Sequence, residues 1–159
     1  MQDALTSFGI GSNQEICEDG TPALLTGDLP VGGGGNYQYQ WFSSTNNFTW
    51  NSISGATVQN YQPGPLSVTT YFKRELDAAN CDATSNIVTV TVNPKPVAAI
   101  TAPASQICVY DAGSVSFRAS TGTAPFAIRL VVTKPGGVTD TISRTINNNG
   151  PVSIQVIAP

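Results

Sequence analysis

The sequence predicts an all-β protein, and three observations carry this prediction. Val and Ile together number 25 against 7 Leu, and 26 Gly and Pro are scattered along the 159 residues. β-Branched side chains favour strands, whereas Gly and Pro interrupt helices. No window of about a dozen residues shows the apolar period of an amphipathic helix. Short segments that alternate between apolar and polar residues are present instead.

The first part of the chain contains three predicted strands, which cover residues 37–42, 69–76 and 87–92. A hairpin loop joins the second and third of them and contains Cys81. The alternation of the first strand places Tyr37, Tyr39 and Trp41 on one face. We expect this aromatic face to point inward.

The second part contains four more predicted strands, which cover residues 114–119, 126–133, 138–146 and 152–157. Turn residues at 134–137 and 147–151 separate them. Many short strands with frequent turns favour two small β-sandwiches in a row.

A weak internal repeat and two prolines predict the domain boundary. Ile16-Cys17 recurs as Ile107-Cys108, and Asn93-Pro94-Lys95-Pro96 lies between the two copies. Prolines stop strands and stiffen connectors, so we expect one domain over residues 1–94 and a second over residues 95–159. The second is shorter and is predicted to lack its last strands. The first carries a net charge of −6 and the second +3, which favours contact between neighbouring repeats.

Composition excludes several functions and partners. The net charge is −3 and the isoelectric point is near 4.6, so no clustered basic face exists for nucleic acid. No apolar run approaches the length of about 20 residues that crosses a bilayer, so membrane insertion is not expected. The chain has no His, which is the commonest general base and metal ligand. Paired carboxylates could still hydrolyse a glycoside. However, nothing in the spacing of the acidic residues along this sequence distinguishes them from ordinary solvated charges. We therefore expect no enzyme activity and no cofactor beyond a possible calcium ion.

The cysteines predict one disulfide. Cys17 and Cys81 fall at the start and near the end of the first domain, and a Cys17–Cys81 bridge would stabilise it by about 4 kcal/mol. Two buried free thiols are the alternative. Cys108 has no partner at the matching spacing and is predicted to be unpaired, which, with the short second domain, indicates a piece of a longer secreted chain.

If the bridge forms, five acidic residues are drawn toward one end of the first domain. They are Glu15, Glu18, Asp19, Asp77 and Asp82. Clustered carboxylate oxygens are the ligands of Ca²⁺, so this set is a candidate calcium site. The alternative is a solvated acidic end.

Three aromatic residues form a candidate carbohydrate site. Phe42, Phe48 and Trp50 are set among Ser, Thr and Asn residues, and aromatic faces flanked by amides and hydroxyls can stack on sugars. The alternative is that they cover the edge of a sandwich.

A spaced pattern along residues 14–94 resembles the immunoglobulin-like repeats of large surface proteins from gliding and biofilm-forming Bacteroidetes. The matching positions are Gln40-Trp41, Trp50, Ile53 to Thr57, Tyr61, Thr69 to Tyr71, Cys81 and a Thr/Val strand ending at Pro94. The second domain resembles a companion repeat related to polycystic-kidney-disease-type domains. No Cys lies in the strand beginning at Thr69, unlike in antibody domains, so their core disulfide is not implied.

The resemblance implies an exported cell-surface adhesin built of tandem immunoglobulin-like modules, secreted by the type IX system and involved in attachment or gliding motility. It implies an extracellular location and contacts with neighbouring repeats, surface polysaccharide or other surface proteins. Thr141 lies in a short pattern that resembles O-glycosylation acceptors of this phylum. The alternative function is a carbohydrate-binding accessory region of a secreted hydrolase.

Overall fold

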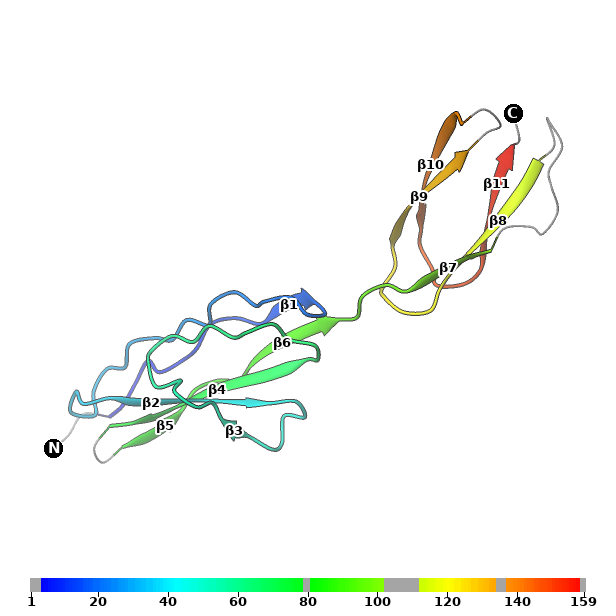
Figure 1. The fold of residues 1–159 in the computed structure, drawn as a ribbon. Coiled ribbons are helices and arrows are strands. Elements are labelled where there is room, and N and C mark those ends of the chain that lie inside the picture. The colour runs from blue at the N-terminus through cyan, green and yellow to red at the C-terminus, as the bar shows by residue number, and fades with distance from the viewer. Residues whose placement is uncertain (1–3, 79–80, 102–111, 134–136, 158–159) are drawn as a thin grey trace. The chain divides into compact units, whose positions relative to one another are not determined.

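The computed structural model describes residues 4–78, 81–101, 112–133 and 137–157, and within them every regular element is a strand (Figure 1). The all-β prediction is confirmed. The chain forms two compact units, Met1–Asn93 and Pro94–Pro159, and the division falls one residue before the predicted boundary. The described part of the chain holds no helix long and apolar enough to cross a membrane.

The first unit is built on one six-stranded sheet. Its strands are β1 (Gln14–Cys17), β2 (Gln38–Ser44), β3 (Asn51–Ser52), β4 (Thr70–Asp77), β5 (Asp82–Thr84) and β6 (Val88–Asn93). The order across the sheet is β1-β6-β4-β2-β3, and β5 pairs with β4. All pairs are antiparallel except β1 with β6, which is parallel.

One face of this sheet is covered by extended segments that form only isolated bridges. Ile10 bridges Gly27, and Leu25 bridges Tyr61. These segments supply Ile10 and Leu25 to the core, where they meet side chains from the sheet. The segments between residues 4 and 35 are rich in Gly and Pro, which interrupt regular pairing.

Trp41 lies at the centre of the first core. Its side chain is fully buried, and its Nε1 donates a 2.9 Å hydrogen bond to the Val58 carbonyl. The Tyr61 ring lies 5.7 Å from the Trp41 ring and 6.0 Å from Phe72. Burial raises the pKa of Tyr61. The inward position expected for Trp41 is confirmed, because the β2 alternation places it on the core face.

Arg74 is also buried in this core, at 1 % exposure, and points inward from β4 between Phe72 and Leu76. Its Nη1 donates to the Gln59 carbonyl at 2.8 Å, and its Nη2 donates to the Asp28 carbonyl at 3.0 Å. Longer bonds of 3.3 and 3.4 Å reach the carbonyls of residues 8 and 9. One side chain therefore links the sheet to three separate covering segments.

The electrostatics of Arg74 reflect this burial. Desolvation lowers the pKa of the guanidinium, while the nearby Tyr39 and Asp28 raise it. The Cζ atom lies 4.7 Å from the centre of the Tyr39 ring and 5.9 Å from that of Trp41. An arginine remains charged in proteins, so four carbonyls and two aromatic rings solvate a buried cation here.

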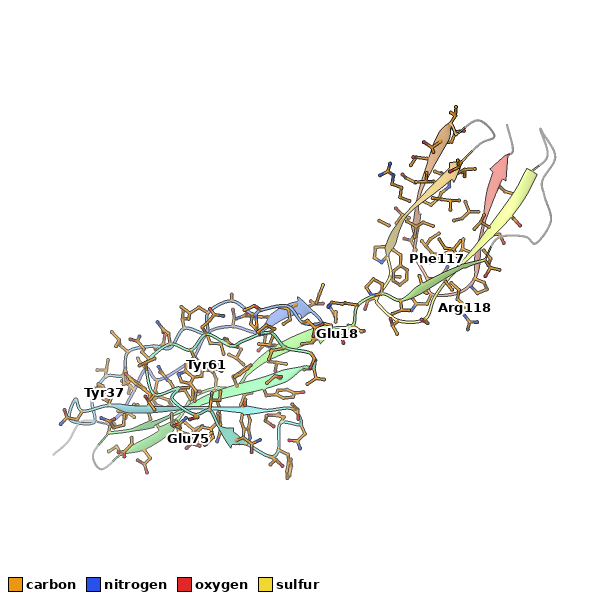
Figure 2. The ribbon with its side chains drawn as sticks, in the orientation of Figure 1. Glu18, Tyr37, Tyr61, Glu75, Phe117 and Arg118 are labelled. Atoms are coloured by element: carbon orange, nitrogen blue, oxygen red, sulfur yellow. The ribbon has the colours of Figure 1, made fainter. Side chains whose placement is uncertain are left out.

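The second unit contains two smaller sheets. Its strands are β7 (Ala98–Thr101), β8 (Ala112–Ala119), β9 (Phe126–Thr133), β10 (Thr139–Ile146) and β11 (Val152–Ile157). One sheet has the order β11-β8-β7, and the other pairs β10 with β9. Phe117 and Phe126 meet at 6.1 Å in a core of their own, whereas Arg118 points outward (Figure 2).

The predicted Cys17–Cys81 disulfide is wrong in this structure, where both residues are free. Cys17 lies opposite Asn93, at the end of β6 that extends beyond Thr70 of β4. Cys81 follows the opposite end of β4, which finishes at Asp77. The eight residues of β4 span about 24 Å, but a disulfide requires Cα atoms within about 7 Å. The parallel pairing of β1 causes this separation, because it carries Cys17 away from the hairpin. Cys108 lies outside the described residues.

Candidate functional site

The outer face of the first sheet is the surface on the side away from the core, over β2, β4 and β5. Alternation along β4 directs Thr70, Phe72, Arg74 and Leu76 inward and the residues between them outward. Figure 2 shows Tyr61 on the core side of the sheet and Glu75 on the opposite side. Tyr71, Lys73, Glu75 and Asp77 are therefore the outward residues of β4.

An aromatic cluster at the middle of the outer face surrounds Lys73. The Lys73 Nζ atom lies 5.0 Å from the centre of the Phe42 ring and 5.1 Å from that of Trp50. The same atom lies 2.7 Å from Glu75 Oε1. Each cation–π contact stabilises such a cluster by about 0.5–1 kcal/mol at a partly exposed site. The rings of Phe42 and Trp50 are therefore held by a cation of the same chain.

Phe48 lies apart from this arrangement, at the tip of the loop between β2 and β3, with 91 % of its surface exposed. Asn46 stabilises the loop, because its Oδ1 accepts hydrogen bonds from the backbone N–H groups of Phe48 and Thr49 at 2.9 and 2.8 Å. Within the described residues Phe48 makes no ring contact. The structure thus brings together two of the three aromatic residues of the candidate carbohydrate site.

A groove of about 500 Å³ lies on the outer face at the β4–β5 hairpin end. Its lining residues are Gln38, Tyr39, Gln40, Glu75, Leu76, Asp77, Asp82, Ala83 and Thr84. Three carboxylates, two amides and two hydroxyls are among them, so the groove is suited to hydrogen-bond a polar ligand. This volume falls within the range of about 300–1,000 Å³ seen for small-molecule sites.

The predicted calcium site is not assembled. Glu15, Glu18 and Asp19 lie at the β1 end of the unit. Asp77 and Asp82 lie at the hairpin end, where β2 begins. Figure 2 labels Glu18 at one end and Tyr37 at the other. Glu15 accepts a hydrogen bond from Asn93 Nδ2. Across the described residues, no group of three or more metal-ligating side chains is close enough to hold an ion. The parallel pairing of β1 with β6 separates these two ends, just as it separates Cys17 from Cys81.

Thr141, the candidate glycosylation site, lies on β10 opposite Val131 and is exposed. Its hydroxyl is accessible, and no described contact occupies it.

Arg74 and Lys73 are the residues that sequence reasoning missed. Arg74 occupies an inward position of a strand whose other inward residues are Thr70, Phe72 and Leu76, so the period of two carries a signal for a buried arginine. Lys73 gives no such signal. Its contact with Phe42 depends on the β2–β4 register, and this register is set by the whole fold.

Comparison with known families identifies a family for the first unit. Residues 6–94, more than half of the chain, match a family model described as a domain of unknown function, DUF8696. No curated protein matches the chain. The matched segment ends at the division between the two units and contains the whole outer face. The chain therefore belongs to the DUF8696 family.

Proposed function

We propose that the first unit is an immunoglobulin-like sandwich. The strand order β1-β6-β4-β2-β3 corresponds to the sheet of that fold that contains strands G, F and C, with β6, β4 and β2 in these roles. Trp41 then occupies the place of the buried Trp on strand C. Leu25 and Phe72 fill the core where antibody domains have a disulfide.

The second unit supports a related proposal. Its β11-β8-β7 sheet corresponds to strands E, B and A of the same fold, and β9 corresponds to strand C. Counterparts of strands F and G are not among the described strands. This inventory supports the proposal that the second unit is an incomplete sandwich of the same kind.

As function we propose a non-catalytic repeat region of a bacterial cell-surface adhesin, which acts in attachment or gliding as spacer and display modules. The observation that carries this proposal is the presence of two consecutive units with separate cores. The two prolines of Asn93-Pro94-Lys95-Pro96 stiffen the connection. Charged residues make up 11 % of the chain, and the hydroxyl- and amide-rich surface suits a protein that works outside the cell.

Surface display can be tested in cells of the source organism. An antibody raised against the purified chain should label intact cells, and protease added outside should remove the label. Deleting the gene should reduce attachment or gliding, and a copy that lacks residues 6–94 should fail to restore it. A label that appears only after lysis would contradict the proposal.

A further inference from the structure

We propose that the groove of the outer face binds a glycan that carries no negative charge. The inference rests on the proposed display function, because a display module acts by holding a ligand outside the cell. It names the chemical class of that ligand. It also locates the site at the hairpin end of the sheet, beside the aromatic cluster rather than on it.

The polar side chains of the groove form a regular grid. The strand register arranges them in two rows, Gln38–Asp77–Asp82 and Gln40–Glu75–Thr84. Neighbouring strands lie about 4.8 Å apart, and two residues along a strand rise about 6.8 Å. The grid therefore measures about 10 by 7 Å, which is suited to a sugar ring with its hydroxyl groups.

The bonds within the protein leave acceptors available to a ligand. Gln40 uses its Nε2 group to donate to the carbonyls of Trp41 and Ile53, at 2.9 and 2.8 Å. Its Oε1 atom remains as an acceptor. Glu75 binds Lys73 through Oε1, so its Oε2 atom remains. These bonds fix the two side chains in place before a ligand arrives, which lowers the entropy cost of binding.

Asp77 and Asp82 supply the strongest indication that the grid has a function. They face each other across β4 and β5, and both are exposed. Like charges directly opposite each other in a sheet destabilise it, and neither aspartate forms an ion pair with a described residue. Local arrangements that oppose stability are found at functional sites. Hydroxyl groups of a sugar would donate to both carboxylates and offset their repulsion.

Charge decides which glycans fit. Residues 1–94 carry eight acidic and two basic side chains. One of the two basic residues, Arg74, is buried, and the other, Lys73, is paired with Glu75. The groove therefore repels uronic acid and sulfated chains, and accepts neutral or amine-bearing sugars.

The aromatic cluster is less suited to be the primary site. The rings of Phe42 and Trp50 already contact the Lys73 ammonium, and a sugar stacked on them would compete with that cation. Phe48 is free, but it is a single ring on a loop. A glycan long enough to extend from the groove would meet these rings second.

NMR titration of the full ¹⁵N-labelled chain tests the location and the class together. The probes are hexamers of glucose, N-acetylglucosamine, glucosamine and galacturonic acid. We expect at least one of the first three to shift backbone signals of β2, β4 and β5 around the groove, and the galacturonic acid hexamer to shift none. Shifts confined to the loop of residues 45–50, equal binding of the anionic hexamer, or no shift with any probe would each overturn the proposal.

Variants of the chain separate binding from folding. Asp82→Asn should lower the affinity for the best probe at least tenfold, while the midpoint of urea unfolding rises because the repulsion with Asp77 is removed. Glu15→Gln is the matched control. It removes one charge from the far end of the unit, keeps an oxygen for Asn93, and should leave affinity unchanged. An Asp82→Asn variant that binds as the unaltered chain does would refute the assignment.

A negative result here differs from failure of the proposed function. The chain could be detected on the cell surface and support attachment, yet bind none of the four hexamers. That result would refute the glycan site and leave the display role intact.

Discussion

Replacing Arg74 with Met should remove about 3–5 kcal/mol of the stability of the first unit. Methionine keeps much of the volume of the side chain but donates no hydrogen bond. The Gln59 and Asp28 carbonyls would lose their bonds of 2.8 and 3.0 Å. A buried acceptor left without a donor costs about 1–3 kcal/mol, and loss of the longer bonds to residues 8 and 9 adds a smaller amount.

This loss is large compared with the total stability of a domain, which is about 5–15 kcal/mol. Urea unfolding followed by Trp fluorescence measures it, because Trp41 is fully buried in the same core. Arg118→Met is the control, since Arg118 is exposed in the second unit, and its effect should stay within about 0.5 kcal/mol. A loss below about 1 kcal/mol for Arg74→Met would refute the view that this side chain connects the covering segments to the sheet.

Three further predictions follow from contacts in the first unit. Gly27→Ala should destabilise it by about 1–3 kcal/mol, because the new Cβ would lie 2.6 Å from Arg74 Cζ; unchanged urea unfolding would contradict this contact. The pKa of Tyr61 is raised in the folded chain, so this group contributes stability that is complete below its unfolded pKa of about 10. That stability is lost as pH rises through the pKa of the folded state. Tyr61→Phe should therefore flatten the fall in melting temperature above about pH 9.5. Non-reducing peptide mapping should find no Cys17–Cys81 link, and Cys17→Ser should change the free energy of unfolding by less than about 0.5 kcal/mol; a measured link would show that the fold differs from the one described.

Alternation in the sequence predicts much of the strand content. Phe126–Thr133 and Val152–Ile157 have the predicted bounds, and β4 begins and ends one residue later than predicted. These strands contain six or eight residues, so the period of two is visible in each. The strands that were missed, such as β3 and β7, contain two and four residues. Their existence depends on a partner strand rather than on a local pattern.

The candidate sites show more clearly what the sequence alone cannot predict. The disulfide and the calcium site both assumed that the β4–β5 hairpin lies beside the opening strand, and the parallel pairing of β1 with β6 places them apart. Strand direction is a property of the whole sheet, and no local spacing encodes it. The groove was missed for the same reason, because its two rows come from three strands that meet only through register.

The parallel pairing of β1 with β6 also determines how the first unit responds to force. β1 is the first strand of the unit and β6 is the last, and four residue pairs join these strands in the same direction. Tension on the two ends of the unit therefore slides one strand along the other and loads all of these hydrogen bonds at once. An antiparallel pair pulled from its open end would instead break one bond at a time. The β1–β6 pair is thus arranged to resist stretching along the chain, because its bonds share the load.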